Sequence, residues 1–243
     1  MYIIKLNAID STNSYLKGLA SVAIPKDFTV VVTESQTNGR GQMGSVWQTQ
    51  SGKNLTASVF KRLTSYRVQD QFYISMAVSI SIYKALLTYK IPKLSVKWPN
   101  DILSADTKLC GVLIENVIKN NNLQGSIIGF GLNVNQKVFT NLPKASSMCQ
   151  ITGVVYSKDE ILSEVIKQLK YYFEILESKN FDKIKLEYED LLFRRNKPST
   201  FQTPNNEKFS GILKGITNDG HLKVWTEDDI IKTFDLKEIK LLY

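Results

Sequence analysis

Histidine and cysteine are scarce in this chain, with one histidine and two cysteines among 243 residues. A histidine-activated nucleophile or a multi-histidine metal site would have to be built around His221. His221 follows Asp219-Gly220, a strong hairpin-turn signal, so we expect an exposed turn residue there. Cys110 and Cys149 are too distant in sequence for a metal-binding pair and too few for a disulfide scaffold, and we expect both to be small core residues.

Long hydrophobic runs are also missing. No apolar stretch approaches the roughly 20 residues that cross a bilayer, and the N-terminus lacks the segments of a secretory signal. We therefore expect a cytoplasmic protein with no membrane partner. The nucleotide-binding pattern GxxxxGK[ST] does not occur, and neither does an internal repeat. A P-loop site and a repeat array are excluded.

The composition is that of an ordinary globular protein with a basic balance. Hydrophobic residues make up 43% and charged residues 22%, which excludes wholesale disorder and a fibrous design. Lysine and arginine outnumber aspartate and glutamate by 31 to 23, a formal charge of +8. Such a balance favours an anionic partner, and a nucleotide, a nucleic acid and an acidic protein all qualify.

Hydrophobic periodicity predicts a mixed α/β layer over the first part of the chain. The expected strands lie at residues 28–32, 55–60, 94–97, 110–117 and 125–134. The expected helices lie at residues 70–89, 157–176 and 181–193, the second of them capped by Ser157.

The pattern changes from helix to strand near Pro198. Beyond it, short apolar runs separated by turn residues lie at 199–202, 208–216, 222–226 and 230–234. This spacing predicts a small β-barrel of about 45 residues. We therefore expect two domains, residues 1–195 and 196–243.

The segment from Gly39 to Gly44 matches the spacing GxGxxG of dinucleotide-binding proteins. The residues after Gly44 are not helical, and no acidic residue lies about 20 positions on, so that interpretation fails. An irregular ligand loop fits better, with glycines that let backbone N–H groups approach an anion and with the charge of Arg40. An ordinary surface loop is the alternative for this segment taken alone.

Polar residues also end or begin three expected strands. Lys97-Trp98-Pro99-Asn100-Asp101 offers carboxylate and amide oxygens suited to Mg²⁺, although an Asx turn explains the same residues. Lys108 precedes a buried strand, where it could meet a phosphate or carboxylate. Gly111 and the pair of glycines in Gly129–Asn133 indicate either close approach of a ligand or a bulge.

Near the N-terminus, Ser11-Thr12-Asn13 precedes a short amphipathic segment. Ser11 or Thr12 is a good helix cap. The same hydroxyl and amide groups could also bind a ureido or amide ligand.

Taken together and in order, these segments closely resemble the biotin protein ligases. The matching segments are Ser11–Asn13, Glu34–Trp47, Lys97–Asp101, Lys108–Glu115 and Gly129–Val134. The resemblance is strong over residues 1 to 150 and implies an α/β fold with a mixed central sheet flanked by helices, as in class II tRNA synthetases. It also implies that the last stretch is an SH3-like barrel.

The resemblance implies an ATP-dependent biotin acetyl-CoA-carboxylase ligase. Biotin and ATP would give biotinyl-adenylate and pyrophosphate, and a lysine of a biotin carboxyl carrier protein would then take the biotin. This chemistry needs charge neutralisation and alignment more than a histidine base, which suits a chain with one histidine. The implied ligands are biotin, ATP and Mg²⁺.

Roles follow residue by residue from the matching segments. Lys108 and Arg40 would be catalytic, with Lys108 between the biotin carboxylate and the α-phosphate. Asn100 and Asp101 would hold the metal. The residues that would bind biotin or nucleotide are Ser11, Thr12, Asn13, Gln36, Gly39, Gly41, Gln42, Trp47, Lys97, Asn100, Gly111, Gly131 and Asn133.

Two features depart from the family. Gln42, Met43 and Ser45 follow Arg40 where relatives often have arginines, so retention of the adenylate is expected to be weaker. The first motif begins at residue 11, so we expect neither the winged helix-turn-helix of the repressor members nor specific DNA binding. Many relatives pair through the sheet, which leaves a homodimer open.

Two other functions compete with a biotin ligase. A lipoate or octanoate ligase would have a similar fold, but its triple-glycine and His-Asp patterns are absent, and the Arg40 loop and Lys97–Asp101 are of the biotin type. A basic nucleic-acid-binding module is the second alternative, favoured by the charge and the 11 tyrosines.

Overall fold

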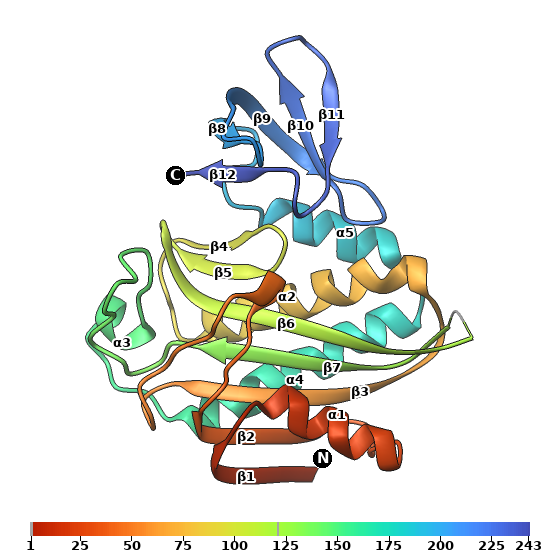
Figure 1. The fold of residues 1–243 in the computed structure, drawn as a ribbon, viewed down its shortest axis with the longest axis vertical. Coiled ribbons are helices and arrows are strands. Elements are labelled where there is room, and N and C mark those ends of the chain that lie inside the picture. The colour runs from red at the N-terminus through yellow and green to blue at the C-terminus, as the bar shows by residue number, and fades with distance from the viewer. Residues whose placement is uncertain (1, 121) are drawn as a thin grey trace.

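A seven-stranded mixed sheet forms the centre of the molecule (Figure 1). The computed structural model describes residues 2–120 and 122–243. The strand order is β1-β2-β3-β7-β6-β5-β4, and within the described residues only β1 and β2 pair in parallel. The strands are β1 (Tyr2–Ile9), β2 (Thr29–Gln36), β3 (Leu55–Arg67), β4 (Leu94–Lys97), β5 (Asp101–Ser104), β6 (Thr107–Lys119) and β7 (Asn122–Leu132).

Helices cover both faces of this sheet. On one face, α1 (Thr12–Val22) packs on β2, β3 and β7 through Leu16. On the other face, α2 (Gln71–Thr88) and α4 (Lys158–Glu177) pack against each other and the sheet, with α5 (Phe181–Asp190) beside α2. A short helix, α3 (Met148–Thr152), follows the last central strand.

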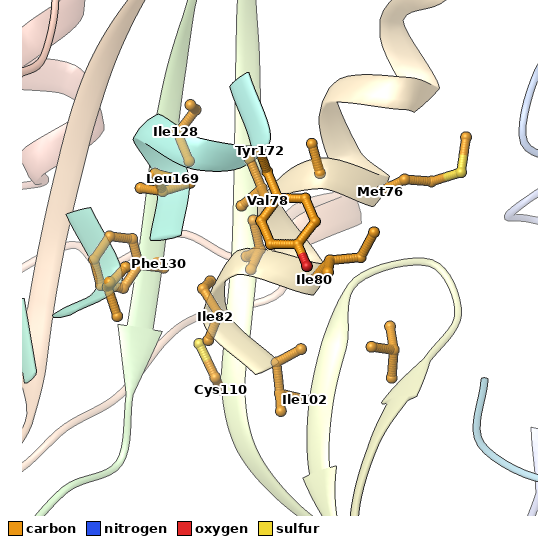
Figure 2. Close-up of a cluster of buried hydrophobic side chains, with 14 of the residues drawn as sticks. Met76, Val78, Ile80, Ile82, Ile102, Cys110, Ile128, Phe130, Leu169 and Tyr172 are labelled. Atoms are coloured by element: carbon orange, nitrogen blue, oxygen red, sulfur yellow. The ribbon is translucent and has the colours of Figure 1, made fainter. Parts of the chain in front are cut away.

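The main core lies between α2, α4 and the sheet (Figure 2). Ile80 and Ile82 of α2 are fully buried against Ile102 and Ile128 of the strands and Leu169 of α4. Each such side chain stabilises the fold by about 1.5–3 kcal/mol when buried. Helix α2 has buried residues all around its circumference, which is why its sequence is apolar rather than amphipathic.

Serine caps begin two helices where the sequence predicts them. The Ser11 side chain accepts a hydrogen bond from the Ser14 backbone N–H at 3.4 Å, and Ser157 accepts one from the Glu160 N–H at the same distance. Such a cap stabilises a helix by about 1 kcal/mol. The cap of α1 also turns the chain so that Ser11 and Thr12 lie buried beside the sheet.

A second sheet follows α5 and has five antiparallel strands in the order β11-β10-β9-β8-β12. The strands are β8 (Pro198–Gln202), β9 (Lys208–Ile216), β10 (Leu222–Thr226), β11 (Ile231–Phe234) and β12 (Lys240–Leu242). Strands β11 and β12 are the two edges and do not pair with each other in the described chain. Phe201, Leu213 and Ile216 of this sheet join the main core.

Most expected elements are confirmed, with differences at weak signals. The structure adds β1, β5, β12 and α3, and α5 ends at Asp190, three residues before its expected end at Phe193. Strand β1 lies at the sheet edge with many exposed residues, so its sequence lacks the apolar run of a buried strand. Strand β5 has four residues and depends on pairing with β4 and β6.

The histidine and cysteines lie where the sequence places them. His221 lies partly exposed at the turn before β10, and Cys110 and Cys149 are buried. Burial raises the pKa of the Cys110 thiol far above its usual range, so it stays a neutral core group. Of the helices in the described residues, none combines the length and apolar character that a bilayer span requires.

Candidate functional site

One cavity of about 550 Å³ lies beside the main sheet, within the usual size range of small-molecule sites. It is lined by α1, the loop after β2, the β4–β5 turn, the first half of β6 and the C-terminal end of β7. The structure brings the predicted site residues together there, with the exception of Gly39. A Cβ on Gly39 would lie 2.3 Å from the Trp47 carbonyl oxygen, so this glycine serves close backbone packing instead.

A network of short polar side chains forms one end of the cavity. The Thr12 backbone N–H donates to Gln36 Oε1 at 2.8 Å, and the Thr12 hydroxyl donates to the same oxygen at 3.2 Å. Ser58, on β3, lies with its hydroxyl 2.7 Å from the Thr12 hydroxyl and donates to Asn13 Oδ1 at 2.6 Å. With Gln36 Oε1 accepting these bonds, its amide NH₂ is left to donate to a ligand.

The predicted ligand loop folds back on itself as a small hairpin. The Trp47 N–H donates to the Gly39 carbonyl at 2.9 Å, and the Gly41 N–H donates to the Ser45 carbonyl at 2.7 Å. The tip is a single 3₁₀ turn, Gln42–Gly44, where Gly44 has φ of 79°. This positive φ favours glycine, which adopts it without a steric cost.

The indole of Trp47 lies against two glycines of the central strands. A Cβ on Gly131 would be 2.2 Å from Trp47 Nε1, and a Cβ on Gly111 would be 3.1 Å from the same ring. The two positions face each other in the β6–β7 register. Trp47 Nε1 is buried and has no hydrogen-bond partner in the described residues, so this N–H can donate to a ligand that enters the cavity.

Cationic side chains gather at the other end of the cavity. Lys108 Nζ lies 2.7 Å from Asp101 Oδ1, and Lys97 Nζ lies 4.0 Å from Asp101 Oδ2. Burial lowers the pKa of Lys97; Asp101 opposes this shift, and nearby lysines including Lys108 and Lys144 add to it. One carboxylate thus faces more than one cation, which leaves net positive charge for an anionic ligand.

The predicted metal pair has mixed surroundings. Asn100 is buried and its Nδ2 donates to the Val112 carbonyl at 2.8 Å, which leaves its side-chain oxygen as an acceptor. Asp101 supplies one carboxylate, and the described residues contain no group of three histidine, cysteine or acidic side chains. A single carboxylate and an amide suit Mg²⁺ that arrives with substrate phosphates rather than a permanently bound metal.

Sequence analysis missed several residues of the cavity wall. Lys144 and Phe139 come from the loop after β7, and Tyr243 follows β12 of the second sheet. Lys144 Nζ lies 3.8 Å from the centre of the Tyr243 ring, within cation–π distance. No sequence motif marks Tyr243 or Lys144, and the first lysine after the glycine-rich strand is Lys137, which does not line the cavity.

Comparison with known proteins gives concordant matches. The model of the Biotin/lipoate A/B protein ligase family matches residues 6–133. The bifunctional ligase/repressor BirA of Escherichia coli is 29% identical over 238 residues, which cover 97% of this chain and 73% of that protein. The Biotin--[acetyl-CoA-carboxylase] ligase of Mycobacterium tuberculosis is 26% identical over 216 residues, covering 87% of this chain and 79% of that protein.

The fold gives the same result. The structure of the biotin protein ligase from Aquifex aeolicus in complex with biotin and ATP superimposes with a TM-score of 0.82 and 26% identity. That alignment covers 99% of this chain and 98% of the other.

Proposed function

Because the chain belongs to the biotin/lipoate A/B protein ligase family, we propose that it is a biotin protein ligase. It activates biotin with ATP and transfers the biotin to a lysine of a carrier protein. The observation that carries the proposal is the single cavity wall that joins a polar, neutral end at Thr12 and Gln36 to a cationic end at Lys97 and Lys108. A ligand with a neutral polar head and an acid tail, placed next to a polyphosphate, fits this arrangement.

In the first step, a carboxylate oxygen of biotin attacks the α-phosphorus of ATP, and the bond to the pyrophosphate breaks. Both reactants are anions, so the site must screen their repulsion and hold them in line. Lys108, at the cationic end and with its Nζ 5.6 Å from the centre of the Trp47 ring, is the residue placed to do this, and Lys97 and Lys144 of the same wall would neutralise the leaving pyrophosphate. Asp101 and Asn100 would hold Mg²⁺ with the phosphates, and the metal would add further neutralising charge.

In the second step, the lysine amine of the carrier attacks the acyl carbon of the mixed anhydride, and the bond to AMP breaks. The products are an amide, AMP and a proton. No protein nucleophile is required, which agrees with a cavity that contains neither histidine nor cysteine among its described lining residues. Trp47 covers the anhydride from the loop side and limits the access of water.

The proposal includes finer points that the sequence predicts. We expect a catalytic domain at residues 1–195 and an SH3-like β-barrel domain at residues 196–243. We expect the carrier to be the biotin carboxyl carrier of a carboxylase. Absence of operator binding and a cytoplasmic location also stay predictions, with footprinting and cell fractionation as their measurements. Pairing of two chains stays open, and sedimentation measures it.

The direct test is exchange of labelled pyrophosphate into ATP with biotin as the second substrate. We expect exchange that depends on biotin, and a large loss in Lys108→Ala. Lys167→Ala is the matched control, because Lys167 lies exposed on α4, where its Nζ is 3.3 Å from Glu164 Oε2. Exchange with lipoate instead of biotin would move the chain to the lipoate branch, and salt-sensitive nucleic-acid binding without exchange would favour the nucleic-acid module.

A further inference from the structure

The loop that closes the cavity carries one charged side chain. Arg40 is the only charged residue in the sequence from Gly39 to Trp47. Its guanidinium Nη2 lies 2.9 Å from Glu115 Oε2, on strand β6. Arg40 lines the cavity, whereas Glu115 lies just outside its wall. The position of the one loop charge is therefore set by a carboxylate that does not itself face the ligand.

Glu115 is held in turn by the polar end of the cavity. Asn13 Nδ2 donates to the same oxygen, Glu115 Oε2, at 2.8 Å and to the Leu113 carbonyl at 3.2 Å. Asn13 is buried, and its Oδ1 accepts a hydrogen bond from Ser58. A Cβ on Gly129 would lie 2.2 Å from Asn13 Oδ1, so the amide has little room to move. The carboxylate is thus attached to a rigid part of the site.

An arginine can be shared between two anions. A guanidinium has five N–H donors in a planar fork, and Glu115 engages the Nη2 group. The remaining donors point elsewhere in the same plane, so Glu115 can orient the fork while Arg40 binds a ligand carboxylate or phosphate. Because the loop has no second charged residue, a loss of the Arg40 orientation would leave the loop with no correctly oriented cation to bind an anionic intermediate.

We infer that Glu115 is a positioning residue that orients Arg40 from outside the cavity and thereby controls how long the anionic intermediate stays bound. This inference rests on the proposed function, in which that intermediate is biotinyl-adenylate. Glu115 also connects the loop to Asn13, because Asn13 and Arg40 donate to the same carboxylate oxygen. The polar end of the cavity and the loop would therefore bind the two ends of the adenylate together.

The test is the rate at which preformed, labelled biotinyl-adenylate leaves the enzyme during a chase with unlabelled adenylate. Glu115→Gln keeps the shape of the side chain and removes its charge, and Glu115→Asp keeps the charge. We expect Glu115→Gln to speed release on the order of tenfold, the loss of one charge-assisted hydrogen bond. Glu115→Asp should restore most of the retention.

Two further variants separate positioning from general stability. In an Arg40→Ala background, Glu115→Gln should cause no additional change, because the residue acts through Arg40. Lys17→Ala is the matched control, since Lys17 Nζ lies 3.8 Å from the other oxygen of Glu115 on the exposed side; its release rate should equal that of the native chain.

The outcomes are distinct. A native chain that forms adenylate, with Glu115→Gln releasing it at the native rate, would overturn the inference and leave the ligase function intact. An equal acceleration by Glu115→Gln in the native and Arg40→Ala backgrounds would also overturn it, since that indicates a structural effect. A native chain that forms no adenylate from biotin and ATP would refute the proposed function itself.

Discussion

At the scale of single residues, two cations of the site each have a carboxylate partner within the protein. Lys108 lies against Asp101 and Arg40 against Glu115, at 2.7 and 2.9 Å. Partly exposed pairs of this kind contribute little to stability, about 0–1 kcal/mol. Their value is positional, because each holds a long, flexible side chain in place before a ligand binds. Removal of one such cation should therefore affect catalysis far more than folding.

For Lys108→Gln we expect the rate of biotin-dependent pyrophosphate exchange to fall by about 100-fold to 1000-fold, the usual cost of removing one charge-stabilising donor. The unfolding temperature should change little. Steady-state exchange and thermal unfolding of the same preparations check both. A variant that unfolds early would show instead that the Lys108–Asp101 pair maintains the fold.

A buried tyrosine determines part of the alkaline stability. Burial raises the pKa of Tyr66 to about 12, with Glu177 and Asp70 adding to the shift. Above about pH 10 the unfolded chain loses this proton while the folded chain keeps it. The folded state then binds more protons than the unfolded state. The contribution of Tyr66 to the free energy of unfolding is therefore fully present below pH 10 and falls as the pH rises toward 12, by at most about 1.4 kcal/mol per pH unit.

Tyr66→Phe should remove the part of the alkaline loss of unfolding free energy that comes from ionisation of Tyr66. Urea unfolding at several pH values between about 9 and about 11 gives the slope for both proteins. The native chain should lose stability faster than the variant over that range. Parallel slopes would mean that Tyr66 ionises as easily in the folded protein as in the unfolded chain.

At the scale of elements, glycines in β6 and β7 make the central strands less stable but leave room for side chains that pack on them. Glycines in the interior of β6 and β7 weaken a strand, since they have no side chain to pack. Here the missing side chains at Gly111 and Gly131 admit the Trp47 indole, and the one at Gly129 admits the Asn13 amide. Glycine occurs at these positions of the two strands because the covering side chains leave no room for a Cβ.

Gly131→Ala tests this relation. Its Cβ would lie 2.2 Å from Trp47 Nε1, so the indole has to leave the sheet and the loop should open. We expect faster release of adenylate and a higher KM for ATP. The matched control is Gly18→Ala on the exposed face of α1, where a Cβ meets nothing within 4 Å; it should leave the ligand behaviour unchanged and stabilise the helix by about 1 kcal/mol. Native kinetics in Gly131→Ala would contradict the close contact.

At the scale of the whole molecule, the second sheet helps to position the cationic end of the cavity. Trp98 Nε1 donates to the carbonyl of Gly220, in the turn before β10, at 2.9 Å. The hydroxyl of Tyr188 on α5 donates to the Pro99 carbonyl at 2.5 Å. The turn between Lys97 and Asp101 is thus attached to elements that come about 90 to 120 residues later in the chain.

Trp98→Phe should weaken ATP binding through this connection. The variant keeps an aromatic ring but removes the N–H, which leaves the Gly220 carbonyl without its donor at a cost of about 1 kcal/mol. We expect a several-fold higher KM for ATP and a nearly unchanged KM for biotin. Trp225→Phe is the control, because its exposed indole donates to Asp229 far along the second sheet. Equal effects of the two changes on ATP would show that the two sheets are not coupled at the site.

The site motifs and their order could be predicted from the sequence, because each motif lies within a short stretch of consecutive residues. Ser11–Asn13, the loop around Arg40, Lys97–Asp101 and Lys108 each combine turn residues with polar groups, and the structure brings them into one cavity. Long apolar runs and serine caps likewise predicted the buried strands and the two capped helices. Local propensity and periodicity are sufficient for such features.

The remaining features depend on contacts between distant segments, and only the tertiary structure decided them. Strand β1 forms an edge that needs β2 as its partner, and Tyr243 reaches the cavity from the second sheet. The pairings of Lys108 with Asp101 and of Arg40 with Glu115 depend on how β5, β6 and the loop meet in space. The sequence alone thus determined which chemical groups are present and in what order, while the packing of the sheets decided which charges neutralise one another, because electrostatic interactions depend on distance in space.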